Sequence, residues 1–209
     1  MATREILRDG EHDLSGKSRV VTDFNKRLHI LLDDMRETLI EANGLGLAAP
    51  QVGVFRRAVL IVKSNNEHEG SDRDVNDDDD DDDDEILNEE MDEEQYREWL
   101  SEQIIELVNP EIIIKEGEQS GSEGCLSVPG VYGIVTRPET VVVRAQNRHG
   151  DTFELEVSNL AARAVCHEVD HLDGVLFTSL AERFLTEEEL AELRARHEKN
   201  KENGAGDED

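Results

Sequence analysis

Apolar residues recur at helical spacing in the first part of the chain. Within residues 23–42 the apolar positions repeat every three or four residues, and this stripe consists of Phe24, Leu28, Leu31, Leu32, Met35 and Leu39. Thr22 or Asp23 is placed to cap the start, and Gly44 follows the end. We therefore expect an amphipathic helix over residues 23–42.

Several extended segments follow this helix. Residues 58–62 form a β-branched, apolar run that is typical of a buried strand. Extended character returns in later short segments, which are 107–110, 111–114, 131–135, 141–145 and 153–157. A turn at 147–151 separates the last two. The pattern predicts a meander of mostly antiparallel strands.

Two more helices are expected after the strands. Residues 159–172 have helical character, with Ser158 as a possible cap and Gly174 just beyond the end. Thr186 and Glu189 form a capping-box pattern, which predicts a last helix running to about residue 199 before an acidic, flexible tail at 202–209. We predict one α+β domain over residues 1–209, with antiparallel sheets packed around helix 159–172 and a C-terminal helix.

Acidic residues are concentrated in one segment. The chain has a formal net charge of -29, and residues 64–106 hold 21 acidic residues against Arg73 and Arg97. Eight consecutive aspartates at 77–84 repel one another, so we expect a partly disordered surface insertion over 64–106. An apolar stripe near its end predicts a short helix that covers a patch of the body, and its members are Met91, Tyr96, Trp99, Leu100 and Ile104. The residues outside this segment carry only a moderate negative net charge. A negatively charged surface does not attract nucleic acid, so nucleic acid is not an expected partner.

The composition also bears on the compartment. Two cysteines cannot form a disulfide framework, and they suggest a reducing environment. Residues 1–9 have no signal-peptide core, and no apolar run approaches the ~20 residues of a membrane span. We expect a cytoplasmic protein without membrane contact, and a monomer by default.

The pattern His167-Glu168-x-x-His171 on the expected helix predicts a metal site. Histidines four residues apart share one helix face, so both imidazoles reach one ion, with Glu168 beside it as a possible general base. A catalytic site usually needs a third protein ligand. Cys166 points away on the same helix, so Cys125 is the better third ligand. A thiolate with two imidazoles suits Zn²⁺ or Fe²⁺.

Three motifs together resemble those of peptide deformylases. They are Gly44-Leu45-Gly46-Leu47-Ala48-Ala49-Pro50-Gln51, Glu123-Gly124-Cys125-Leu126-Ser127 and His167-Glu168-x-x-His171, and they occur in the family's order. The resemblance implies hydrolysis of the formyl group from the formyl-methionine of nascent peptides, with Fe²⁺ as the usual ion and Zn²⁺, Ni²⁺ or Co²⁺ as substitutes.

The resemblance also implies roles for individual residues. Glu168 would move protons, while the backbone N–H of Leu126 and the amide of Gln51 would stabilise the oxygen that becomes negative. The substrate backbone would lie along Leu45, Gly46 and Gly124. The expected site thus has nine residues. The catalytic ones are Glu168, Gln51 and Leu126, the metal ligands are Cys125, His167 and His171, and the substrate-binding ones are Leu45, Gly46 and Gly124.

Other residues have plainer interpretations. Glu123 is expected to be an ion-pair partner of Arg137 or Arg144, and Cys166 a packed helix residue. Asp170 either orients a ligand histidine or has a solvated or helix-capping role. The five histidines without a partner at ligand spacing are expected at the surface, and they are His12, His29, His68, His149 and His197.

Two other functions fit parts of the pattern. A metallopeptidase would use the same helix, but no residue after His171 offers its usual third ligand. A non-catalytic interaction protein would use the acidic insertion, but it predicts loss of catalytic residues that are all present. Basic residues of the last helix suggest transient ribosome contact, and they are Arg194, Arg196, Lys199 and Lys201.

Overall fold

The computed structural model describes residues 2–63 and 92–191. The helices are α1 (Lys26–Ala42), η1 (Ala49–Val52), α3 (Glu93–Gln103), α4 (Asn159–Leu172) and η2 (Phe177–Ser179). The strands are β1 (Gly46–Ala48), β2 (Ala58–Val62), β3 (Ile104–Glu116), β4 (Gln119–Cys125), β5 (Val128–Arg137), β6 (Thr140–Gln146), β7 (Thr152–Ser158) and β8 (Arg183–Phe184). The predicted α+β fold with antiparallel sheets is confirmed. None of the described helices combines the length and apolar character that a membrane crossing requires.

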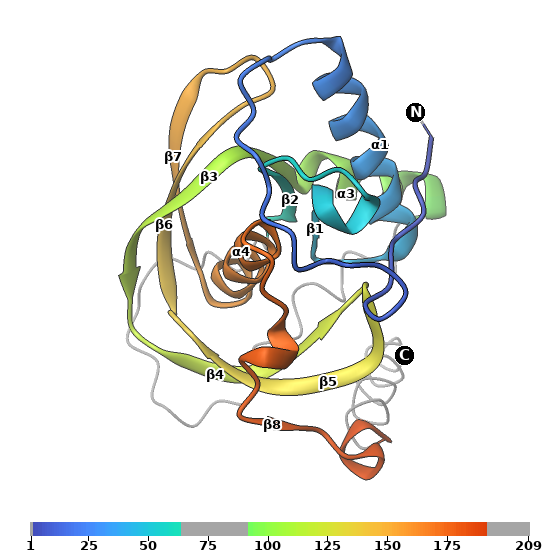
Figure 1. Ribbon diagram of the computed structural model, residues 1–209, viewed down its shortest axis with the longest axis vertical. Helices are drawn as coiled ribbons and strands as arrows, with labels where there is room; N and C mark the ends of the chain where they lie inside the picture. The colour runs from blue at the N-terminus through green and yellow to red at the C-terminus, as the bar shows by residue number, and fades with distance from the viewer. Residues whose placement is uncertain (1, 64–91, 192–209) are drawn as a thin grey trace, which may run out of the picture.

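Two antiparallel sheets enclose α4. The larger has the strand order β1-β2-β3-β6-β7 and the smaller the order β4-β5-β8. Figure 1 shows α4 in the middle of the molecule, with β6 and β7 on one side, β4 and β5 below it, and α1 beyond β1 and β2. The helix with the His-Glu-x-x-His motif is therefore central, as the sequence predicts.

Strand β2 is buried on both faces because helices cover both. Ala58 and Leu60 pack into the apolar cluster under α1, whereas Val59 and Ile61 pack into the cluster around α4. Alternate residues of a strand point to opposite faces, so a strand between two helical layers needs apolar residues at every position. This explains the continuous apolar run at 58–62.

Helix α1 begins three residues later than predicted. Its cap is Asn25, whose side chain accepts hydrogen bonds from the backbone N–H groups of Arg27 and Leu28. The expected caps Thr22 and Asp23 are therefore wrong. At the other end Asn43 takes the left-handed conformation with φ 49°, which asparagine tolerates.

Helix α4 has the predicted bounds but not the predicted capping bond. Ser158 precedes it, yet the Ser158 hydroxyl bonds to the Thr140 hydroxyl and makes no capping bond. Gly174 follows the helix with φ 74°, and a Cβ there would lie 2.1 Å from the Ser15 carbonyl oxygen. Only glycine fits this crossing of the N-terminal arm.

The strands differ from the prediction at several places, and β1 and β8 are among the strands that were not predicted. Residues 107–110 and 111–114 belong to one strand, β3, which is interrupted by irregular pairing around Asn109. Strand β3 also begins at Ile104, so the last three residues of the predicted 64–106 insertion pair with β2. Strand β4 was not predicted, because its Ser, Gly and Gln residues give no strand pattern.

Helix α3 covers the body as expected. Tyr96 and Trp99 pack against the cluster under α1, and Leu100 and Ile104 are buried there. Met91 and the aspartate run lie outside the described residues, as does most of the predicted C-terminal helix. The capping box that begins the predicted C-terminal helix is present. The Thr186 hydroxyl accepts a hydrogen bond from the Glu189 N–H, and the Glu189 carboxylate accepts one from the Thr186 N–H.

Candidate metal centre

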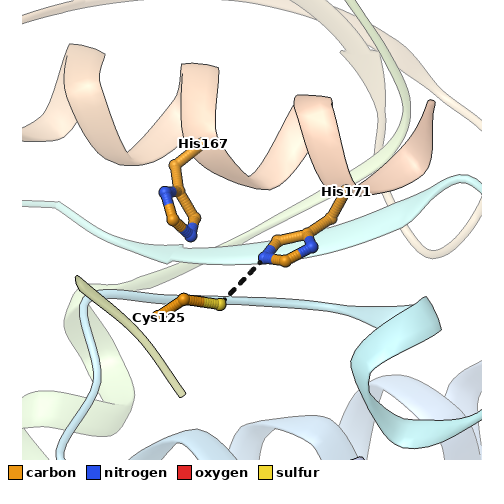
Figure 2. A group of neighbouring side chains, drawn as sticks. All are labelled: Cys125, His167 and His171. Carbon is orange, nitrogen blue, oxygen red and sulfur yellow. Dashed lines mark hydrogen bonds between the residues drawn. The ribbon is translucent and has the colours of Figure 1, made fainter. Parts of the chain in front are cut away.

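Cys125, His167 and His171 converge in space although they come from two elements. Their ligand atoms all lie within 4.8 Å of one another. Cys125 ends β4, and the two histidines project from the face of α4 that meets it, with Cys125 Sγ 3.2 Å from His171 Nε2 (Figure 2). The predicted trio is thus brought together, whereas Cys166 is buried in the core cluster around α4.

Glu123 fixes the orientation of His167. The Nδ1 atom of His167 lies 3.0 Å from Glu123 Oε2. Because a carboxylate accepts hydrogen bonds, Nδ1 donates its proton to Glu123, which leaves Nε2 as the nitrogen available to a metal ion. A carboxylate behind a ligand histidine is a common feature of metal sites. Glu123 therefore supports the site as well as forming the expected ion pair.

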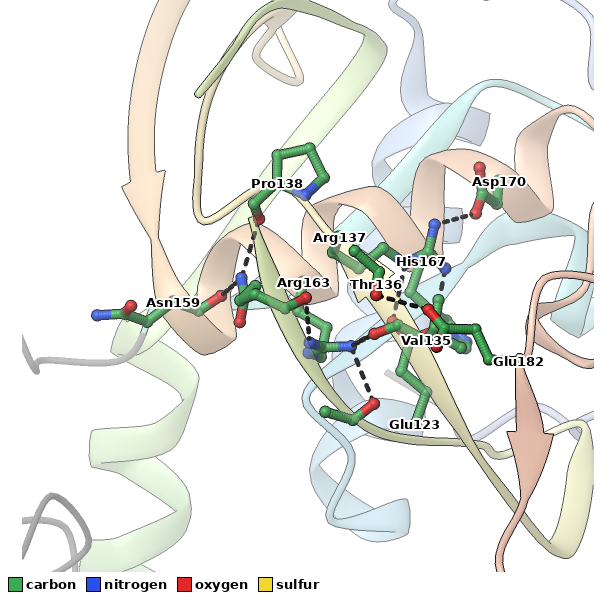
Figure 3. Close-up of polar contacts among 12 residues, drawn as sticks. Glu123, Val135, Thr136, Arg137, Pro138, Asn159, Arg163, His167, Asp170 and Glu182 are labelled. Atoms are coloured by element: carbon green, nitrogen blue, oxygen red, sulfur yellow. Dashed lines mark hydrogen bonds and ion pairs between the residues drawn. The ribbon is translucent and has the colours of Figure 1, made fainter. Parts of the chain in front are cut away.

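Two arginines hold Glu123 in place (Figure 3). Arg137 donates to both Glu123 oxygens at 2.8 and 3.0 Å, and Arg163 donates to Oε1 at 2.9 Å. Arg137 also donates to Asp170 at 2.6 Å. The expected Glu123–Arg137 pair is confirmed, and Asp170 contacts Arg137 instead of a ligand histidine.

These contacts set the charges around the site. Burial alone would raise the pKa of Glu123, but hydrogen bonds from His167 and Arg137 lower it to about 2, so the carboxylate is ionised. Burial lowers the pKa of His171 to about 3, so this imidazole is neutral at pH 7. A neutral imidazole is the form that binds a metal.

Glu168 is enclosed beside the ligands. It is 4 % exposed, and its Oε2 atom has no hydrogen-bond partner. Burial raises the pKa of Glu168 to about 7. Gly46 of β1 packs against it, and a Cβ at Gly46 would lie 2.5 Å from Glu168 Oε1. A carboxyl group with this pKa and a free oxygen is suited to exchange protons with a bound water.

Gln51 approaches the same point from η1. Its Oε1 atom accepts from the Ala48 N–H at 2.8 Å, and its Nε2 atom lies 3.5 Å from Cys125 Sγ. Leu126 follows Cys125, and its side chain packs against the cluster under α1. The side-chain amide of Gln51 is thus held beside the metal ligands, with its nitrogen directed toward Cys125.

A cleft of about 480 Å³ opens over these residues. Its lining includes all nine predicted site residues except His171: Leu45, Gly46, Gln51, Gly124, Cys125, Leu126, His167 and Glu168. Leu45, Tyr132 and Leu160 are exposed apolar residues of the same lining. The cleft therefore combines a polar floor with partly apolar walls, as small-molecule and peptide sites do.

The family model of polypeptide deformylase matches residues 3–185. The chain belongs to this family. It is 46% identical to the peptide deformylase of Caldicellulosiruptor bescii, over 95% of this chain and 98% of that protein. It is 43% identical to peptide deformylase 1 of Bacillus subtilis, over 92% of this chain and 99% of that one.

Solved structures of deformylases share the fold. The Legionella pneumophila peptide deformylase has a TM-score of 0.65 at 32% identity, covering 99% of this chain and 100% of its own. The class I type b peptide deformylase of Acinetobacter baumannii, bound to Met-Ala-Ser, has a TM-score of 0.65 at 29% identity, covering 86% and 99%. The present deformylase-family chain is accordingly an enzyme.

The residues behind the ligands of this deformylase-family site have no separate signal in the sequence. The sequence predicts Glu123 only as an ion-pair partner, and no sequence pattern singles out Arg163. Glu123 lies two residues from Cys125 on β4, so alternate residues of one strand serve the same site. Recognising β4 as a strand would have predicted that Glu123 and Cys125 face the same side.

Proposed function

We propose that this protein hydrolyses the formyl group from the N-terminal formyl-methionine of newly made polypeptides. The products are formate and a peptide with a free amine. The convergence of Cys125, His167 and His171 beside the buried Glu168 is the observation that supports this function best. Membership of the polypeptide deformylase family supports the same reaction.

The donor set fits one divalent ion. A thiolate and two imidazoles make three of the four ligands of a tetrahedral catalytic site, and Glu123 already orients one imidazole. We propose Fe²⁺ as the resident ion, with Zn²⁺, Ni²⁺ or Co²⁺ as substitutes. When bound, such an ion lowers the pKa of a water molecule and polarises the formyl carbonyl.

Glu168 serves as the general base and acid of the proposed reaction. Its unpartnered Oε2 takes a proton from the attacking water, and the same carboxyl group returns a proton to the departing amine. A pKa of about 7 suits both transfers near neutral pH, because neither form of the group is strongly disfavoured.

Gln51 and Leu126 stabilise the formyl oxygen as it becomes negative. The Gln51 amide nitrogen is directed toward Cys125 Sγ, and the Leu126 N–H belongs to the residue that follows this ligand. Hydrogen-bond donors that are already oriented before the reaction need no reorganisation in the transition state. One such donor lowers the activation free energy by roughly 3 to 4 kcal/mol.

The peptide lies between two strand edges. Strand β1 is an end strand of the larger sheet and β4 an end strand of the smaller one, and residues of both line the cleft. A peptide that pairs with Leu45, Gly46 and Gly124 adds a strand to these edges. The Met-Ala-Ser complex of the Acinetobacter baumannii enzyme supports a short methionine-led peptide as occupant.

The proposed substrate also sets the place of action. Formylated chains emerge from the ribosome, so we propose that the protein acts in the cytoplasm, in transient contact with ribosomes. The basic residues that suggested this contact lie outside the described residues.

Product analysis separates this function from that of a metallopeptidase. Formyl-Met-Ala-Ser incubated with protein purified without oxygen should release formate and leave Met-Ala-Ser intact. The metal-free protein is the control, and it should release neither product. Release of free amino acids without formate would instead establish a peptidase.

A further inference from the structure

The side-chain amide of Gln51 has a defined orientation. Its Oε1 atom accepts a hydrogen bond from the Ala48 N–H. If Oε1 and Nε2 exchanged places, the NH₂ group of Gln51 would face the Ala48 N–H, and two donors cannot bond to each other. The Nε2 group therefore faces the opposite side, where it meets two acceptors. These are Cys125 Sγ at 3.5 Å and the hydroxyl oxygen of Ser127 at 3.2 Å.

Ser127 is fully buried although it lies in a turn. Cys125 pairs with Val128 at the junction of β4 and β5, so Leu126 and Ser127 are the two residues that connect these strands. Ser127 is 0 % exposed, and its hydroxyl contacts Gln51. A buried hydroxyl is unfavourable unless it is hydrogen-bonded, so this contact accounts for a polar residue here.

The N-terminal arm fixes the distance between the two segments. The Leu7 N–H donates to the Gln51 carbonyl oxygen at 2.8 Å, and the Asp9 N–H donates to the Ser127 carbonyl oxygen at 2.8 Å. Alternate residues of the arm thus hold η1 and the β4–β5 turn side by side. Because both backbones are held, a shift of the turn cannot replace a lost hydroxyl contact.

We infer that Ser127 is a positioning residue for the proposed deformylation: its hydroxyl accepts one amide hydrogen of Gln51 and directs the other toward the formyl oxygen. Without the hydroxyl, only the Ala48 N–H still holds the amide, so the amide rotates more freely about its last bond and its second hydrogen is directed less accurately. The effect falls on the transition state, where the oxygen gains charge, so kcat changes and KM does not. This inference rests on the proposed function and on the role of Gln51 in it.

A double-mutant cycle tests the inference. Ser127→Ala, Gln51→Ala and the double variant are assayed with formyl-Met-Ala-Ser, and metal content is measured on each sample. We expect Ser127→Ala alone to lower kcat about 5-fold with KM unchanged, as the loss of one hydrogen bond implies. In the Gln51→Ala background the same change should alter kcat by less than about 1.5-fold, because the two residues act as one unit.

The controls separate positioning from stability. Ser120→Ala removes an exposed hydroxyl from β4, the strand that leads into the turn with Ser127, and should retain the wild-type kcat. An equal loss of kcat from Ser127→Ala in both backgrounds would overturn the inference, as would a loss matched by lost metal. A wild-type protein that binds metal but releases no formate would refute the proposed function itself.

Discussion

At the scale of single residues, Gly46 and Glu168 constrain one another. Glu168 is buried because β1 lies directly against it, and β1 lies so close because residue 46 has no side chain. The raised pKa of Glu168 follows from that burial. A small residue in a cleft wall thus helps to set the protonation of the proposed general base.

Gly46→Ala should impair turnover more than folding. The added Cβ would lie 2.5 Å from Glu168 Oε1, so Glu168 must move, and a displaced catalytic group costs roughly 100-fold in kcat/KM. Metal content should stay at the wild-type level because no ligand moves. Gly16→Ala is the control, since its Cβ would crowd Phe55 at 2.9 Å, away from the site, and should lower stability without a loss of kcat. Wild-type turnover by Gly46→Ala would contradict this account.

Glu123→Gln should weaken both metal binding and folding. The change leaves the buried Arg163 without a carboxylate partner and leaves Arg137 with Asp170 alone, which costs about 3 kcal/mol of unfolding free energy. It also weakens the acceptor behind His167, so metal affinity should fall roughly 10- to 100-fold in a chelator competition.

Glu154→Gln is the matched control for that experiment. Glu154 pairs with Arg144, and both side chains are about half exposed. Such a pair contributes at most about 1 kcal/mol, and the metal affinity should be unchanged. Equal effects of the two substitutions would show that burial of Glu123 has no special importance.

At the scale of elements, Glu106 joins α1 to β3 and to the 147–151 turn. It accepts from Arg36 at 3.0 Å and from Arg148 Nε at 2.9 Å. Burial alone would raise the pKa of Glu106, but hydrogen bonds from Arg148 and Arg36 hold it below the ordinary 4.5. A lowered folded-state pKa means that the ionised form stabilises the fold above pH 4.5, and this stabilisation is lost as the pH falls through the folded-state value.

Urea unfolding of Glu106→Gln should show that pH dependence. The substitution should cost about 2 kcal/mol at pH 7, and the difference from wild type should shrink below pH 4.5, where the protonated acid resembles the amide. Glu37→Gln, which removes the partner of Arg97 at 3.5 Å, should change stability by less than about 1 kcal/mol. A difference that is constant from pH 7 to pH 3 would contradict the assignment.

The sequence predicted elements best where one physical signal dominates. The apolar run of β2 and the stripe of α1 identify both elements, because burial requires those residues. Strand β4 was missed because its residues are small or polar and its pairing with β5 is a long-range property. The cap of α1 was misplaced by two or three residues because Thr22, Asp23 and Asn25 all have suitable side chains. The three ligands were predictable because ligand chemistry restricts the choice of residue more than strand formation does.

At the scale of the whole molecule, the candidate active cleft depends on how two sheets meet. Strand β1 brings Gly46, η1 brings Gln51, β4 brings Cys125, and α4 between the sheets brings the histidines and Glu168. No pattern within a single segment shows that the edges of β1 and β4 border one cleft. Most acidic residues of the segment 64–106 lie in the sequence between β2 and β3. The adjoining ends of these two strands are paired at Val62 and Ile104.

The rate of formate release as a function of bound metal tests the central claim most directly. Metal-free protein is reloaded without oxygen with increasing Fe²⁺, and metal content and formate release from formyl-Met-Ala-Ser are measured on the same samples. We predict that the rate rises in proportion to bound metal and levels off at one ion per chain. Formate release by the metal-free protein at the full rate, or full metal occupancy without formate release, would contradict the proposed deformylase.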